Sequence, residues 1–88
     1  MALHIKLSFV GFLARKIGKE ATVEVEENTT LALAVSEISE KYSLGITKLE
    51  PGGEPGYMVI LLNGKSQKPG VKLKDGDEIS FLPIVAGG

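Results

Sequence analysis

TTLALAVSEISEKY, residues 29–42, is the stretch that decides the fold of this sequence. Its apolar side chains recur at intervals of three and four residues, which places them on one side of a helix. They are Leu31, Ala34, Val35, Ile38 and Tyr42. Thr30 and the two residues before it are good N-cap candidates, and we expect the helix to stop close to Gly45. The stretch therefore predicts one amphipathic helix that covers one side of a core.

Two segments before this helix alternate apolar and polar residues with a period of two, which is typical of half-buried β-strands. Their apolar positions are Leu3, Ile5, Leu7 and Phe9 in the first segment and Ala21, Val23 and Val25 in the second. Glycines lie between the segments, so we expect an antiparallel pair joined by a loop. The connecting residues FLARKIGKE show no clear period, and Gly18 marks a turn within them.

The segment after the helix contains a loop, a strand and a tight turn. EPGGEPG at 50–56 is rich in glycine and proline and predicts an exposed, flexible loop. YMVILL at 57–62 predicts a strand, and Asn63-Gly64 after it is a hairpin signal because both residues tolerate positive φ. This strand is apolar on both faces, which indicates either a central position under the helix or a face used by a partner.

A last strand begins at Glu78, directly after a turn that we predict at Asp75-Gly76. The order strand, strand, helix, strand, strand indicates an α+β domain, with a mixed sheet and one main helix packed on one face. A right-handed crossover through the helix places the first and last strands side by side in the middle. The simplest such topology is the β-grasp, or ubiquitin-like, fold. We expect residues 1–83 to form a single domain and residues 84–88 to form a projecting, flexible C-terminal tail.

The composition argues against several classes of function. The 88 residues carry a net charge of −1 and no cysteine, so we expect no nucleic acid, no anionic membrane and no thiol chemistry. The chain shows neither a membrane-length apolar run nor a signal peptide, which predicts a cytoplasmic location. His4 has the pattern of an exposed strand residue, and DGDE at 75–78 lacks the further ligands of a calcium loop. We expect neither a metal site nor an active site within this chain.

The last eight residues, FLPIVAGG at 81–88, give the strongest functional signal. Phe81 shares strand parity with Ile79, so when these two face the core, Leu82 and Ile84 face outward. Bulky apolar side chains would then lie on the outer face just before the tail. That arrangement favours a docking surface over a plain solvated strand.

The chemistry of such a tail is limited to its end. Pro83 restricts φ and removes a donor where the strand ends. Gly87 and Gly88 carry no side chain, so a narrow cleft can admit them. The functional group is then the carboxylate of Gly88, which becomes an electrophile once a partner enzyme converts it to an acyl-adenylate with ATP. This chain would supply the acyl group, and the catalytic residues would belong to the partner.

LKDGDEISFLPIVAGG at 73–88 resembles the C-terminal signature of the MoaD-like small subunit of molybdopterin synthase. This family belongs to the ubiquitin-like sulfur carriers, which also include ThiS-like carriers. IKLSFVGFLARKIGKE is similar to the first strand and loop of the family, TTLALAVSEISEKY to its helix and VILLNGK to its hairpin strand. The resemblance implies that Gly88 is adenylated and then thiocarboxylated. The carrier would then give its sulfur to a pyranopterin precursor in molybdenum or tungsten cofactor biosynthesis.

The same resemblance implies the partners of the chain. They are an E1-like adenylating enzyme that uses ATP and Mg, a sulfur donor protein and the large subunit of molybdopterin synthase, with which the carrier would form a heterotetramer. The chain itself would bind no cofactor and would be a non-catalytic subunit. Gly88 is the residue implied to react, and the residues implied to contact the partner are Leu82, Pro83, Ile84, Val85, Ala86 and Gly87.

Alternatives remain open. The chain could carry sulfur for thiamin or tRNA thiolation, or it could be a ubiquitin-like modifier joined to lysines through Gly88. A β-grasp interaction module with an inert tail is the remaining option. Two features differ from the compact members of the family. The loop at 50–56 is longer, and a group of lysines follows the hairpin, which would suit either a solvated hairpin or an acidic partner. These are Lys65, Lys68, Lys72 and Lys74.

Overall fold

The computed structural model describes residues 2–44 and 58–83. Within these two stretches, four strands and two helices follow one another. They are β1 (Ala2–Phe9), α1 (Phe12–Lys16), β2 (Glu20–Glu26), α2 (Leu31–Tyr42), β3 (Met58–Leu62) and β4 (Glu78–Pro83). The predicted loop at 50–56 and the predicted tail at 84–88 lie outside the described residues.

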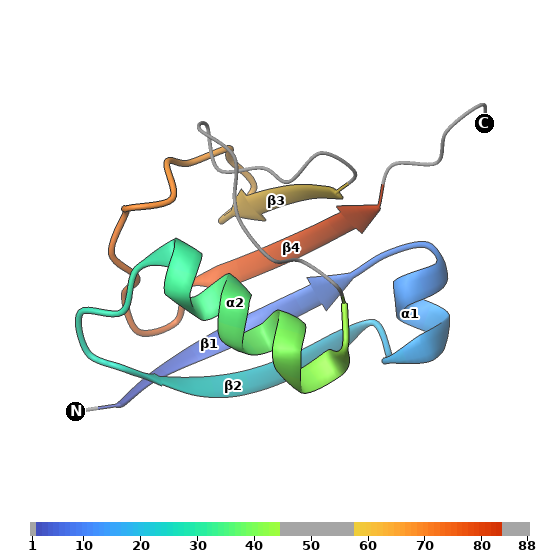
Figure 1. The fold of residues 1–88 in the computed structure, drawn as a ribbon, viewed down its shortest axis with the longest axis horizontal. Helices are drawn as coiled ribbons and strands as arrows, with labels where there is room; N and C mark the ends of the chain where they lie inside the picture. The colour runs from blue at the N-terminus through green and yellow to red at the C-terminus, as the bar shows by residue number, and fades with distance from the viewer. Residues whose placement is uncertain (1, 45–57, 84–88) are drawn as a thin grey trace.

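The strands form one sheet in the order β2-β1-β4-β3, and α2 packs across one face of it (Figure 1). β1 and β4 pair in parallel in the middle, while the two outer pairs are antiparallel. This is the mixed sheet and the pairing of first and last strands that the sequence predicts. The fold is that of ubiquitin-like β-grasp proteins.

β3 lies at an edge of the sheet, so the central position considered for residues 57–62 is wrong. The crossover through α2 brings the last strand beside β1, and β3 then pairs with the outer side of β4 as its hairpin neighbour. The residues of β3 on the face away from α2 are Val59 and Leu61, and both are only partly buried. The second explanation for its apolar pattern, a face used by a partner, therefore remains a prediction.

The core lies between α2 and one face of the sheet. Side chains of β1 and β4 with one strand parity are buried there, and Phe9 stacks on Phe81 with 5.2 Å between the ring centroids. Tyr42 at the end of α2 meets Phe9 edge-on at 5.7 Å. Four of the five predicted inward residues of the helix are likewise buried, and the fifth, Tyr42, is partly buried against the core; the four are Leu31, Ala34, Val35 and Ile38. The strand segments with a period of two and the helix with its period of three to four thus bury their apolar side chains against each other in one core.

The ends of α2 are closed by local hydrogen bonds. The hydroxyl of Thr30, the predicted N-cap, accepts a hydrogen bond from the backbone N–H of Leu33 at 3.3 Å. The backbone N–H groups of Leu31 and Ala32, in the first turn of the helix, donate to backbone carbonyls of the segment between β3 and β4. Ser43 ends the helix with φ 56, two residues before Gly45, which lies outside the described residues. Since these amides have protein partners, the start of α2 offers no anion site.

The short helix α1 was not predicted. Its five residues span little more than one turn, too few for a helical period to show in the sequence. Gly11 enters it with φ 63, a conformation that favours glycine, and Leu13 buries its side chain in the core. Gly18 has φ 121 and makes the predicted turn into β2.

Two turns fix where β4 begins. Asn63 and Gly64 have positive φ values of 53 and 81, and so form the predicted hairpin turn. The side chain of Asn63 donates to the carboxylate of Asp77 at 2.9 Å and accepts from the backbone N–H of Glu78 at 2.9 Å. Asp77 also accepts from the backbone N–H of Lys74 at 2.8 Å. The turn at Asn63-Gly64 and the turn before β4 are therefore linked by hydrogen bonds, and these bonds help to fix the register of β4.

Candidate functional site

The candidate site begins where β4 ends. Leu82 and Pro83 are the last described residues, and the five predicted site residues beyond them lie outside the described part of the chain: Ile84, Val85, Ala86, Gly87 and Gly88. Figure 1 shows β4 running parallel to β1 and stopping at the end of the sheet near α1. The surface around this end can be built from described residues alone.

Leu82 lies on the face of the sheet that α2 does not cover. Ile79 and Phe81 are fully buried on the helix side, while Leu82 is only partly buried. The predicted outward direction of Leu82 is therefore confirmed. Its role in binding a partner stays a prediction.

Pro83 lies on the other side of β4 from Leu82. It pairs with Met58 of β3, whose side chain is buried. Its Cγ lies 3.9 Å from where a Cβ on Gly11 would be, so the loop that enters α1 passes close to the end of β4. A partner that binds both Leu82 and Pro83 must therefore approach from the end of the strand and reach both faces.

Leu82 is part of a larger apolar area at this end of the sheet, which we call the tail-end patch and define as Val10, Val59, Leu61 and Leu82; the last three share the uncovered face. Val59 is paired with Leu82, and Leu61 with Ser80. Val10 follows Phe9, the partner of Phe81 in the parallel pair, and is 43% exposed. The patch thus crosses β3, β4 and the end of β1 at the point where the tail leaves the sheet.

Sequence reasoning placed Leu82 on this surface but missed Val10, Val59 and Leu61 as a group. A signal for two of them was present, because the strand containing Val59 and Leu61 is apolar on both faces. Val10 was missed because it lies one residue beyond β1, where alternation no longer predicts a face.

The patch can bind but cannot catalyse, since its side chains are hydrocarbon. In the part of the chain that the structure describes, no three His, Cys, Asp or Glu side chains cluster in a way that could hold a metal ion. Neither described helix combines the length and apolarity needed to cross a membrane.

A polar corner lies on the same face near the other end of β1. His4 is exposed, as predicted, and its ring lies 3.2 Å from a carboxylate oxygen of Asp75 and 3.4 Å from one of Glu24. Asp75 also accepts the backbone N–H of His4 at 2.7 Å. This hydrogen bond, followed by the one from the His4 ring, lowers the pKa of Asp75. Gly76 has φ 87, so DGDE forms the predicted turn.

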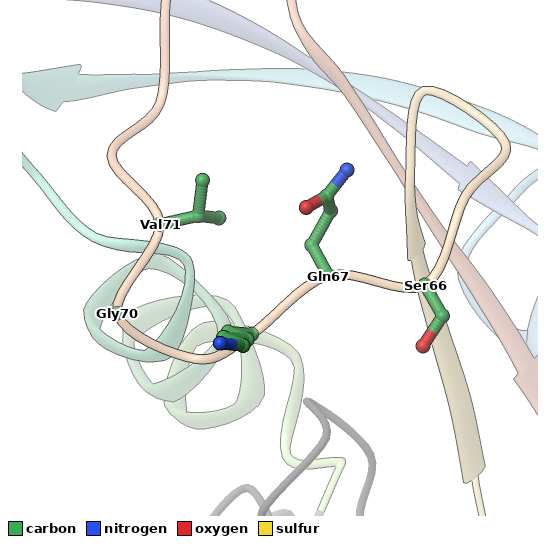
Figure 2. Close-up of a pocket in the computed structure, with 5 residues that line it drawn as sticks. Ser66, Gln67, Gly70 and Val71 are labelled. Carbon is green, nitrogen blue, oxygen red and sulfur yellow. The ribbon is translucent and has the colours of Figure 1, made fainter.

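The segment between β3 and β4 forms an open hollow, lined by Ser66, Gln67, Lys68, Gly70 and Val71 (Figure 2). Gln67 and Val71 project to one side of the loop, and Ser66 points away from them. The backbone of this loop is hydrogen-bonded to α2, because the carbonyls of Pro69 and Val71 accept hydrogen bonds from the first backbone N–H groups of the helix. The hollow is therefore better explained by loop packing than by a ligand.

Comparison with solved structures gives the class of protein. The solution structure of the HVO 2177 protein of Haloferax volcanii is 25% identical and covers 99% of this chain and 88% of that chain, with a TM-score of 0.78. The small archaeal modifier protein 1 (SAMP1) of Methanosarcina acetivorans is 26% identical over 100% of this chain and 99% of that chain, with a TM-score of 0.68.

A third structure is a complex of subunits 1 and 2 of the molybdopterin-converting factor from Helicobacter pylori 26695. Its matching chain is 29% identical, and the match covers 98% of this chain and 100% of that chain, with a TM-score of 0.61. No curated protein sequence matches the chain closely enough to count as a relative.

The fold and these likenesses define a ubiquitin-like protein of the sulfur carrier and modifier class. The model of the ThiS family matches residues 7–88, which is nearly the whole chain, and the chain belongs to that family.

Proposed function

We propose that this chain is a sulfur carrier that acts as the small subunit of molybdopterin synthase, with a thiocarboxylate on Gly88. The observation that carries the proposal is the position of the tail-end patch. An apolar surface surrounds the point where β4 ends, immediately before a sequence that closes with two glycines. The likeness to subunits of a molybdopterin-converting factor supports this choice among carriers.

The chemistry proceeds in two steps, with the catalytic groups on partner proteins. An E1-like enzyme, using ATP and Mg, lets a carboxylate oxygen of Gly88 attack the α-phosphorus, and pyrophosphate leaves. Hydrosulfide (HS−) supplied by a sulfur donor protein then attacks the acyl carbon and displaces AMP, which leaves a thiocarboxylate. This chain contributes the acyl group and the surface that is recognised.

The described residues would act by positioning. The tail-end patch would dock on the large subunit of the synthase, and Leu82 and Pro83 would fix the direction in which the chain leaves β4. Ile84, Val85 and Ala86 would then contact the walls of the partner's cleft, and Gly87 would pass where a side chain cannot. The terminal sulfur would thus reach a pyranopterin precursor held by the large subunit in a heterotetramer.

A second function follows from the likeness to SAMP1 of Methanosarcina acetivorans, which is named as a modifier protein. The same activated Gly88 could form an amide with a lysine of a target protein. Sulfur transfer to thiamin or tRNA precursors differs from the main proposal only in the acceptor.

The first test is the intact mass of the chain after incubation with ATP in an extract of the cells that produce it. A mass gain corresponding to sulfur in place of oxygen, localised to Gly88, supports a sulfur carrier. Attachment to lysines of other proteins supports the modifier instead. A chain that stays unchanged, while the extract activates an unrelated carrier, overturns both.

A second arm identifies the acceptor. The thiocarboxylated chain is mixed with a molybdopterin synthase large subunit and the pyranopterin precursor, and the dithiolene product is measured. A chain that lacks Gly87-Gly88 is the control, because it keeps the docking surface and loses the reacting group. Sulfur transfer to a thiamin or tRNA precursor, with none to the pyranopterin, would reassign the carrier to the other pathways.

A further inference from the structure

The outer edge of β2 carries backbone groups that the described residues leave free. In the part of the chain that the structure describes, β2 pairs with β1 alone. The backbone N–H of Phe9 donates to the carbonyl of Lys19 at 2.9 Å, which fixes the phase of this antiparallel ladder. Because backbone groups of successive residues point to opposite sides, those of Glu20, Thr22 and Glu24 point away from β1 along the free edge, whereas the outward carbonyl of Glu26 already accepts hydrogen bonds from Thr29. They form a regular row of donors and acceptors.

A groove lies beside this edge, between β2 and α2. It is lined by Val23 and Val25 of β2 and Ile38 of α2, with Glu24, Glu37 and Lys41 around them. In Figure 1, the second half of α2 lies over the β2 side of the sheet, and the residues that line the groove come from these two elements. A strand added to β2 would direct alternate side chains into this groove and the others toward the uncovered face.

The charge around the edge decides which occupant fits. Glu20, Glu24 and Glu26 alternate along β2 on the uncovered face, where Glu24 also contacts His4, while the rim of the groove carries one charge of each sign, Glu37 and Lys41. A second copy of this chain, paired edge to edge, would bring like charges together across the strands, which is destabilising. A strand with basic residues on that face would place opposite charges there instead.

We propose that the β2 edge and its groove bind an extended segment of a partner protein in which apolar and basic residues alternate. The apolar side chains fill the groove between β2 and α2, and the basic ones face Glu24 and Glu26. The binding is independent of the chemistry of Gly88, since β1 lies between this edge and β4, the strand that leads into the tail. One chain could therefore hold this partner while its tail is engaged elsewhere.

The test titrates the full chain with a short N-acetylated peptide of alternating valine and lysine and follows the amide signals by NMR. We expect shifts at Thr22, Glu24 and Ile38, saturable binding and weaker affinity as salt is added. A peptide of alternating valine and glutamate is the matched control and should bind at least about ten-fold more weakly. Equal binding of the two peptides, or edge-to-edge dimerisation of the chain alone, contradicts the proposal.

Backbone methylation separates strand addition from simple charge attraction. One peptide carries N-methyl groups on its lysines and another on its valines, so each loses the donors along one edge only. Strand addition predicts that just one of the two peptides loses binding: the lysine-methylated one for an antiparallel arrangement and the valine-methylated one for a parallel arrangement. If both peptides bind as the parent does, no strand is added.

Variants of the chain give the reciprocal test. Thr22→Pro removes an amide that points outward and leaves the ladder to β1 complete, a position where an edge strand accepts proline. It should weaken binding at least about ten-fold. Glu24→Lys should also weaken binding, and Glu40→Lys, the same charge change outside the groove, should have little effect. If Glu24→Lys and Glu40→Lys weaken binding equally, the acidic face of β2 does not select the peptide.

Discussion

The two faces of β4 differ in burial and in the role that we assign to each. Ile79 and Phe81 have no exposed area on the side of α2, while Ser80 and Leu82, each adjacent to one of them, are partly exposed on the other side. The same six residues therefore contribute both to the core and to the surface that we propose for docking. Fold stability and partner binding should respond to different residues of one strand, and mutations can test that separation.

The largest effect is expected on the covered face, from Phe81→Ala. The side chain is fully buried and stacks on Phe9, so its removal leaves a cavity in the centre of the core. We expect a loss of about 3–5 kcal/mol in the free energy of unfolding, measured by urea denaturation. A loss below about 1 kcal/mol would mean that the core does not close around β4.

The next largest effect is expected at the turns that fix the register of β4, because this register determines which of its side chains face the core and which face outward. Asn63→Ala removes two side-chain hydrogen bonds to the start of β4 and leaves alanine at positive φ. We expect a loss of about 1–2 kcal/mol in urea denaturation. Asn63→Gly is the control, because glycine relieves the backbone strain but not the lost hydrogen bonds. If the glycine variant is as stable as the parent, the link between the two turns contributes nothing.

On the uncovered face, Leu82→Ser should separate stability from binding. The side chain is only partly buried, so we expect the free energy of unfolding to fall by less than about 1 kcal/mol. Binding to the activating enzyme or the synthase large subunit should weaken about ten-fold or more, because Leu82 lies in the middle of the tail-end patch.

The matched control for this change is Leu33→Ser. Leu33 is 58% exposed on α2, outside the tail-end patch, so the same substitution there removes an apolar surface residue elsewhere. Calorimetric titration of both variants against the partner compares the two positions directly. Equal weakening at both positions would show that the patch is not the docking surface.

The sequence predicted the elements with long periodic patterns and missed those whose form depends on their neighbours. Alternation in β1 and β2 and the helical spacing of α2 each span several repeats, so their buried faces could be read directly. α1 is too short to show a period, and the edge position of β3 follows from pairing between distant segments. The tail-end patch was predicted only through Leu82, since Val10 and Val59 join it across strands rather than along the chain.

The smallest effect is expected at the polar corner of the uncovered face, far from the patch. The pKa of Asp75 is lowered in the folded protein, chiefly by the backbone N–H of His4 and then by the His4 ring. A carboxyl group whose pKa is lower in the folded state stabilises the fold above its unfolded pKa, and the contribution is lost as pH falls through the folded pKa.

Thermal unfolding of Asp75→Asn measures this contribution. The melting temperature of the parent should exceed that of the variant at about pH 7, and the difference should shrink below about pH 4, as Asp75 becomes protonated. His4→Gln should lower stability less than Asp75→Asn does, because the backbone N–H remains to hold the carboxylate. A difference that stays constant down to about pH 2 would show that the ionised carboxylate does not stabilise this corner. The uncovered face would then contribute to stability only through its strand pairing, and its charges would be free to serve binding.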